Sequence, residues 1–175
     1  LDIGFGDGRN LPLLNSVASE VISVEITEDI CSVAFKRFPN CKFVCGNASQ
    51  MNLELNSVSL AVAVHSLYYC SNNTFEENLM GVKQVLEPDG RFIFSVPRAG
   101  SYLIKNSRQT NDGYVFVCND PLNIRDGERL KFFENNNKLS ESLVQSGFSN
   151  IRIGSCDNDW WGINEHYWIV SCNKI

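Results

Sequence analysis

The ten residues LDIGFGDGRN, at the start of the sequence, constrain the fold more than any other segment. Asp2 sits in an apolar stub, and glycines follow at every second position as Gly4, Gly6 and Gly8. This pattern is typical of a strand that turns into a helix through a glycine loop, where the backbone approaches a ligand closely. It predicts a nucleotide-type pocket, and a tight turn that binds nothing is the alternative. The dinucleotide motif G-x-G-x-x-G would need glycine where this chain has Arg9.

Size and charge narrow the class of protein. The 175 residues are 43% hydrophobic, enough for one α/β domain over residues 1–175 and too few for two ordinary ones. A net charge of −5 argues against nucleic acid as a partner. No apolar run approaches the ~20 residues that span a bilayer, so we expect no membrane partner.

The seven cysteines are an odd number and contain no C-x-x-C pair. Several of them lie in apolar runs, where a free cysteine behaves as a small hydrophobic residue. We therefore expect reduced thiols, no metal site and a cytoplasmic location.

Only Leu1 precedes Asp2, although the strand before such a loop normally carries several apolar residues. In a doubly wound sheet this strand is central and buried on both faces. We expect the first strand to be largely missing, and the chain to be incomplete at its amino terminus.

Hydrophobic periodicity along the chain alternates between helix and strand as far as residue 97. The expected helices cover residues 11–17, 28–38 and 75–86, and the expected strands cover residues 21–26, 42–45, 59–64 and 91–96. Thr27 is the expected N-cap of the second helix, and Thr74 with Glu77 predicts a capping box for the third. The tetrapeptide EPDG predicts a turn in which Gly90 has positive φ. Strands alternating with helices indicate a doubly wound sheet.

Residues 98–135 lose this rhythm and are interpreted as a substrate-facing segment. A helix is then expected from Asn136 to Gly147, followed by strands over residues 148–154 and 166–174 that close the sheet antiparallel. The polar, aromatic segment 157–165 is expected to be a loop. Its Trp160–Trp161 pair is expected to pack against a helix, and stacking on a substrate is the alternative.

Glu25 ends the second expected strand, 17 positions after Gly8. A carboxylate at this place accepts hydrogen bonds from a ribose diol beside the glycine loop. A solvated acid at the strand end is the alternative, but the loop and the acid together favour a nucleotide ligand.

The segments LDIGFGDG, VISVEIT, VCGNAS, AVAVHSLYYC, VLEPDGRFIFSVP and HYWIVSCNK run through almost the whole chain. Together they resemble the class I S-adenosylmethionine-dependent methyltransferases. The resemblance implies a Rossmann-like α/β fold, a doubly wound sheet of about seven mostly parallel strands with an antiparallel last strand. It also implies S-adenosyl-L-methionine as the cofactor.

The same resemblance assigns site residues. Asp2 and the Gly4–Gly8 loop would hold the methionine and ribose, Glu25 the ribose hydroxyls, Ile26 one adenine face, and Asn47 with Ala48 the adenine edge. The cofactor-binding residues expected in this way are Asp2, Gly4, Phe5, Gly6, Gly8, Glu25, Ile26, Asn47, Ala48 and His65. Asn47 and Ser59 depart from the family, which more often has Asp at both positions. The Asn47 carbonyl oxygen accepts from the adenine amine only if the amide is turned that way.

His65 stands at the carboxyl end of the fourth strand, where ligands lie in open α/β sheets. It contacts the cofactor or the substrate, or it is held by local backbone hydrogen bonds. For a hydroxyl acceptor it is the candidate catalytic base. Tyr68 and Tyr69 line the acceptor pocket or pack under the next helix. His166 is expected to belong to the frame of the last strand.

Six basic residues follow the fifth strand, and we expect most of them to be solvated, although an anionic acceptor is an alternative partner. They are Arg98, Lys105, Arg108, Arg125, Arg129 and Lys131.

The predicted function is methyl transfer from S-adenosylmethionine to a small-molecule acceptor. Because O-, N- and C-directed members share these motifs, the motifs leave the acceptor atom open. One alternative is a methyltransferase-like module that binds a cofactor or a partner without catalysis. Another is a nicotinamide-dependent oxidoreductase, which Arg9 in place of the third glycine disfavours.

Overall fold

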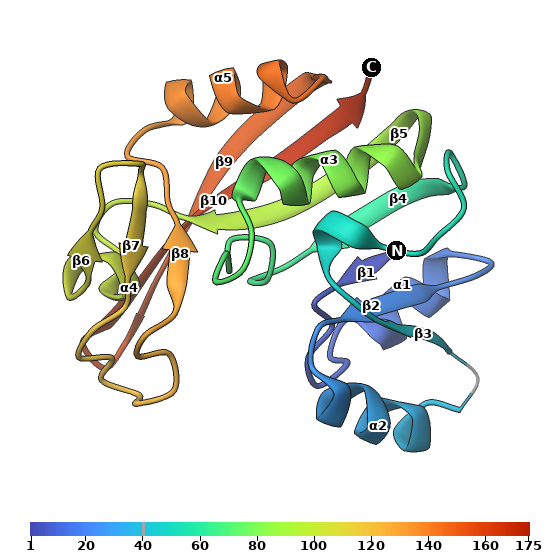
Figure 1. Cartoon of the computed structure of the whole chain (residues 1–175), viewed down its shortest axis with the longest axis horizontal. Helices are drawn as coiled ribbons and strands as arrows, with labels where there is room; N and C mark the ends of the chain where they lie inside the picture. Colours follow the sequence, from blue (N-terminus) through green and yellow to red (C-terminus); the bar gives the residue numbers. More distant parts are fainter. Residues whose placement is uncertain (40) are drawn as a thin grey trace.

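A seven-stranded sheet runs through the computed structural model, which describes residues 1–39 and 41–175 (Figure 1). The strand order is β3-β2-β1-β4-β5-β10-β9. The strands are β1 (Asp2–Ile3), β2 (Ile22–Glu25), β3 (Lys42–Cys45), β4 (Val58–Ala63), β5 (Leu86–Pro97), β9 (Phe148–Trp160) and β10 (Ile163–Lys174). All neighbours are parallel except that β10 runs antiparallel to both β5 and β9. The predicted Rossmann-like sheet with a reversed strand near its end is confirmed.

Helices lie between successive strands, as the alternation predicts. They are α1 (Leu11–Val17), α2 (Glu28–Arg37), the 3-10 turn η1 (Ala48–Gln50), α3 (Phe75–Val85), α4 (Tyr102–Lys105) and α5 (Asn136–Gln145). Figure 1 shows α3 and α5 on the same side of the sheet, and α2 packs against β2 and β3. The predicted capping box is present, with Thr74 Oγ1 accepting from the Glu77 amide at 3.1 Å. Thr27 occupies the N-cap of α2, but its side chain makes no capping hydrogen bond.

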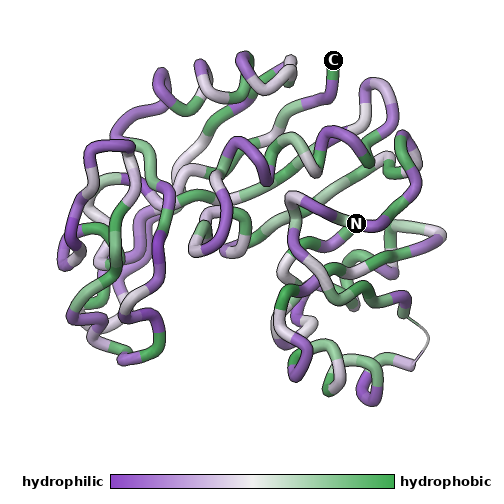
Figure 2. The backbone as a smooth tube through the Cα atoms, viewed as in Figure 1, coloured by the Kyte–Doolittle hydropathy of each residue, from purple (hydrophilic) through white to green (hydrophobic). Residues whose placement is uncertain are grey.

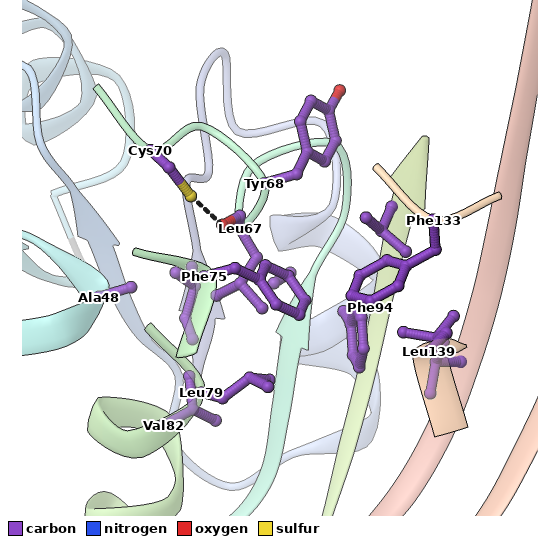
Figure 3. Packing of buried hydrophobic residues seen from close by; sticks show 14 of the residues in the cluster. Ala48, Leu67, Tyr68, Cys70, Phe75, Leu79, Val82, Phe94, Phe133 and Leu139 are labelled. Atoms are coloured by element: carbon purple, nitrogen blue, oxygen red, sulfur yellow. Dashed lines mark hydrogen bonds between the residues drawn. The ribbon is translucent and has the colours of Figure 1, made fainter. Parts of the chain in front are cut away.

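The main core lies between α3 and the centre of the sheet. Phe75, Leu79 and Val82 of α3 are fully buried, and the Phe75 ring lies 6.1 Å from that of Phe94 in β5 (Figure 3). Phe133 closes the cluster, 5.5 Å from Phe75. Each such side chain stabilises the fold by about 1.5–3 kcal/mol through burial alone. Figure 2 shows the corresponding apolar runs along the strands and inner helix faces.

A second, smaller core fixes the glycine loop. Phe5 of this loop is buried against Phe43 of β3, with ring centroids 5.0 Å apart, and Leu11 and Cys31 join them. The helical spacing was predicted correctly here, but some of the apolar positions are not buried. Leu13, Val17 and Val33 are exposed.

Residues 98–135 are more ordered than predicted. After α4 they form a three-stranded antiparallel sheet of β6 (Arg108–Gln109), β7 (Tyr114–Phe116) and β8 (Arg129–Lys131) (Figure 1). Strands of two or three residues have too little periodicity to be recognised in the sequence. The two ends of the segment adjoin, because Arg98 forms a parallel bridge with Phe133, whose amide donates to the Pro97 carbonyl at 3.2 Å.

The last hairpin also differs from the prediction. β9 continues to Trp160 and β10 begins at Ile163, so the expected loop over residues 157–165 is almost entirely strand. Long-range pairing between the two strands overrides their polar composition. The expected packing of the tryptophan pair is wrong, because Trp160 is 52% and Trp161 96% exposed at the hairpin tip.

The tetrapeptide EPDG, expected to be a turn, lies within β5, and the residue with positive φ there is Asp89, not Gly90 as predicted. Asp tolerates this conformation better than most residues do. Among the helices that the structure describes, none combines the length and hydropathy of a membrane span.

Candidate functional site

A cavity of about 720 Å³ opens at the carboxyl ends of the parallel strands. This is the edge at which ligands bind in open α/β sheets. Seven of the predicted site residues line it: Gly4, Gly6, Glu25, Ile26, Asn47, Ala48 and His65. The structure therefore brings together residues from four separate strand ends.

The glycine loop is held against the segment that follows β4. Gly4 has a φ of +69°, and a Cβ at this position would lie 2.2 Å from Cβ of Ser66. Ser66 Oγ in turn donates to the Ile3 carbonyl at 2.5 Å. Only glycine fits this approach, which closes the floor of the cavity between β1 and β4.

Asp2 is fully buried under the glycine loop. Among the described residues its carboxylate oxygens have no hydrogen-bond partner, and burial raises the pKa of this carboxyl to about 6, against the lowering effects of the amino terminus and Asn10. A buried carboxylate of this kind gains most from a cationic partner.

Glu25 links β2 to the glycine loop. Its Oε2 accepts from the Gly6 amide at 3.2 Å, and its Oε1 accepts from the Ile26 amide at 3.0 Å. The side chain is nearly buried. Oε1 also accepts from the Thr27 amide at 3.4 Å, so the acceptor position that is left belongs to Oε2. Glu25 therefore orients the loop while keeping capacity for a hydroxyl donor.

The far end of the cavity follows β3, where Asn47 caps η1 through a hydrogen bond from the Ser49 amide to its Oδ1 at 3.1 Å. Ala48 is held against α3, because a Cβ on Gly81 would lie 2.1 Å from the Ala48 carbonyl oxygen. With Ile26, these residues offer apolar surface and a polar edge, as a purine requires.

His65 lies two residues after β4 in a left-handed conformation, with a φ of +56°. Its amide donates to Ser95 Oγ at 2.8 Å, and its ring meets that of Tyr167 edge-on at 4.2 Å. Burial lowers the pKa of His65, with nearby Arg9 and Arg125 adding to the effect and Glu165 opposing it. A neutral imidazole on the cavity wall is suited to accept a proton.

The segment 98–135 also contributes to the cavity, through Ile124, Arg125 and Glu128. Arg125 donates through Nε to the Tyr69 hydroxyl and through a terminal nitrogen to the Tyr102 hydroxyl, both at 2.9 Å. Asp120 lies 3.9 Å away, but its carboxylate accepts from the backbone amides of residues 122, 124 and 125. Donors of Arg125 therefore remain available to a ligand.

Several predicted residues do not line the cavity. Asp2 lies beneath it, Phe5 faces the smaller core, and Gly8 packs against the Phe38 ring. Tyr68 is buried, whereas Tyr69 lines the cavity. His166 belongs to the frame of β10 as predicted, with Nδ1 2.7 Å from Asp157.

The basic residues were expected to be largely solvated, but three are engaged elsewhere. Arg98 pairs with Asp157, Arg129 with Asp112, and Lys131 with Glu76. Of the six, only Arg125 lines the cavity. Asn73 and Asn78 also line it and were missed. The signal for Asn73 is its place between a strand-end segment and a capping box.

Comparison with known protein families decides the class. The model of a family described as methyltransferase domain matches residues 1–94, more than half of the chain. The chain belongs to the methyltransferase domain family. The match covers the glycine loop, Glu25, Asn47 and His65 within one segment.

A curated relative of this methyltransferase is an uncharacterized methyltransferase of Schizosaccharomyces pombe, 29% identical over 153 residues. The alignment covers 87% of this chain and 55% of the relative, so the chain spans about half the relative's length.

Solved structures of methyltransferases share the fold over 99% of the chain. An S-adenosylmethionine-dependent methyltransferase from Methanosarcina mazei has a TM-score of 0.75 at 18% identity and is covered over 91% of its length. The 1,6-didemethyltoxoflavin-N1-methyltransferase of Burkholderia thailandensis, solved with its substrate and S-adenosylhomocysteine, has a TM-score of 0.67 at 21% identity and 69% coverage. The predicted methyltransferase family and Rossmann-like fold are confirmed, and the comparisons support S-adenosylmethionine as the cofactor.

Proposed function

We propose that this methyltransferase transfers the methyl group of S-adenosylmethionine to a small-molecule acceptor. The observation that carries the proposal is the mixed lining of the cavity. The glycine loop, Glu25 and Asn47 come from the parallel sheet, whereas Ile124, Arg125 and Glu128 come from the segment 98–135. The cavity volume of about 720 Å³ is in the range of small-molecule sites.

The residues present fit the cofactor. The buried Asp2 carboxylate would balance the methionine ammonium, Glu25 would accept from the ribose hydroxyls, and Ile26 with Ala48 would cover the adenine. When bound, S-adenosylmethionine supplies an electrophilic methyl group on a sulfonium. Because much of the catalysis of such a transfer comes from positioning, a rigid wall is the main requirement on the protein.

His65 is proposed as the general base for a hydroxyl acceptor. It lines the cavity, and its lowered pKa keeps the imidazole neutral near pH 7. The edge-on contact with the Tyr167 ring supports the imidazole.

The segment 98–135 is proposed as the acceptor wall, with Arg125 as its polar contact. β8 is tied to the residues after β4, since the Lys131 amide donates to the Tyr68 carbonyl at 2.9 Å. The Burkholderia enzyme acts on a small heterocycle, which supports an acceptor of this size. A cytoplasmic location is part of the proposal, in keeping with the seven free cysteines.

Titration calorimetry on the 175-residue chain tests the cofactor, using S-adenosylmethionine, S-adenosylhomocysteine and NAD. We expect both sulfur ligands to bind and NAD not to bind. Failure of both sulfur ligands would reject the proposal.

Turnover is tested separately, by incubating the chain with labelled S-adenosylmethionine and fractionated small metabolites. Fractions from cells lacking the gene should be enriched in the unmethylated acceptor. Label transfer that occurs only to protein or nucleic acid would reject a small-molecule acceptor.

A further inference from the structure

Three asparagine side chains form a hydrogen-bonded chain beside the cavity. Asn73 Nδ2 donates to Asn47 Oδ1 at 3.1 Å and to Asn78 Oδ1 at 2.5 Å. Asn78 is almost fully buried in α3, and all three residues line the cavity. These hydrogen bonds connect the end of β3 to α3 through the segment that follows β4.

Backbone groups fix the orientation of the Asn47 and Asn78 amides, and these two amides fix that of Asn73. The Ser49 amide can only donate, so the Asn47 atom it contacts at 3.1 Å must be the oxygen. The Leu67 carbonyl can only accept, so the Asn78 atom it contacts at 2.9 Å must be the nitrogen. Asn73 is then required to use both hydrogens of its Nδ2 to satisfy the two oxygens that face it.

Two polar atoms are left over. Among described residues, Asn47 Nδ2 and Asn73 Oδ1 have no hydrogen-bond partner, and both side chains are half-buried at the cavity wall. Asn47 Oδ1 already accepts two hydrogen bonds, which occupy both of its lone pairs. Asn47 therefore presents a donor, and Asn73 presents an acceptor.

A donor beside an acceptor matches the edge of adenine, which offers a 6-amino donor next to a ring-nitrogen acceptor. This inference rests on the proposed function, which places adenine at the Asn47 end. We propose that Asn73 Oδ1 accepts from the adenine 6-amino group and that Asn47 Nδ2 donates to the neighbouring ring nitrogen. In this arrangement Asn73, rather than Asn47, recognises the adenine amine.

The backbone around Asn73 is held rigidly enough for this task. Arg129 donates to the Asn73 carbonyl at 3.1 Å and to the Cys70 carbonyl at 3.0 Å. Directly after it, the Thr74 capping box begins α3, and the Phe75 amide donates to the Tyr114 hydroxyl at 2.9 Å. An acceptor fixed in this way discriminates between ligands, because it cannot rotate to become a donor.

The first test uses the unmodified chain and two ligands. S-inosylhomocysteine has a 6-oxo group and a protonated ring nitrogen, so both of its edge groups oppose those of the protein. We expect it to bind at least about tenfold more weakly than S-adenosylhomocysteine in calorimetry. Equal affinity for the two ligands would overturn the proposal without requiring any variant to fold.

The second test locates the acceptor. In Asn73→Ala the preference for S-adenosylhomocysteine over the inosine analogue should fall to about threefold or less, since the fixed acceptor is gone. Asn47→Ala removes the mismatch at the ring nitrogen but keeps Asn73 Oδ1, so this variant should retain more of the preference than Asn73→Ala. Asn111→Ala, an exposed asparagine outside the cavity, is the matched control, and thermal unfolding verifies that each variant is folded.

The outcomes separate this proposal from the proposed function. If S-adenosylhomocysteine binds but Asn73→Ala keeps the full preference, the assignment to Asn73 is wrong and the cofactor site stands. If S-adenosylhomocysteine does not bind the unmodified chain, both are overturned.

Discussion

Gly81 of α3 approaches the Ala48 carbonyl so closely that a Cβ on the glycine would lie 2.1 Å from the oxygen. A helix on the face of the sheet thus sets the depth of the turn that follows β3. The packing of α3 and the polar edge of the cavity depend on the same contact.

Gly81→Ala should therefore damage both stability and binding. The methyl group forces η1 away from α3, and overpacking of this kind costs about 1–3 kcal/mol, against a gain of at most about 1 kcal/mol in helix propensity. Chemical denaturation should show a lower free energy of unfolding, and S-adenosylhomocysteine should bind more weakly. Gly154→Ala in β9, with no atom within 4 Å of the new Cβ, is the control. Equal behaviour of the two variants would contradict the argument.

Asp2→Asn should stabilise the ligand-free protein at high pH and weaken binding of the cofactor. The folded pKa of Asp2, about 6, is raised above its ordinary value of 3.8. The neutral acid therefore favours folding below pH 3.8, and this contribution is lost as the pH rises through 6. The shift corresponds to a loss of about 3 kcal/mol in the free energy of unfolding at pH 8. The asparagine variant avoids this loss because its amide does not ionise.

The measurement is unfolding free energy between pH 4 and pH 8, with S-adenosylhomocysteine affinity over the same range. Affinity of the unmodified chain should rise through about pH 6, as the carboxylate becomes charged, and affinity of the variant should stay low and flat. Parallel pH profiles would show that Asp2 does not contact the ammonium.

His65→Asn removes the ring at little backbone cost, because asparagine adopts the left-handed conformation readily. With a hydroxyl acceptor, kcat/KM should fall about 100-fold while S-adenosylhomocysteine affinity changes little. The acid limb of the pH profile, set below the ordinary histidine pKa because burial lowers it, should disappear. His166→Asn, outside the cavity, should leave the profile unchanged, and unchanged turnover in His65→Asn would exclude the base.

Arg125→Gln should separate binding of the acceptor from binding of the cofactor. The variant loses the fork that joins the Tyr69 and Tyr102 hydroxyls, so KM for the acceptor should rise about tenfold. S-adenosylhomocysteine affinity should stay within about twofold, since the side-chain contacts of Arg125 are with Tyr69, Tyr102 and Asp120. Lys105→Gln, an exposed residue of the same segment, is the control. A parallel loss of cofactor affinity would show that Arg125 contributes to cofactor binding, contrary to the proposal.

The cofactor end could be predicted from sequence because its requirements are local. Gly4, Glu25 and Asn47 lie at or within two residues of a strand's carboxyl end, and parallel strands bring such positions to one edge. Asn78 and Arg125 could not be predicted in the same way. Their roles depend on contacts with residues far along the chain, Leu67 for Asn78 and Tyr69 for Arg125.

The orientation of Asn47 shows a further limit. The sequence shows Asn47 as a departure from the usual Asp. The direction of its amide follows from Ser49, two residues along the chain, and from Asn73, which the sequence does not place beside it in space. The hairpin was mispredicted for a related reason, because pairing of β9 with β10 decides its length.

The bridge between Arg98 and Phe133 gives the segment 98–133 a property useful for engineering. Its entry and exit adjoin, so a foreign segment with the same end separation would keep the spacing of β5 and α5. Such a segment would also have to keep the contacts of Arg129 with the Asn73 carbonyl and of Tyr114 with the Phe75 amide. A change of acceptor by exchange of this segment is therefore limited by the residues that also support the adenine edge.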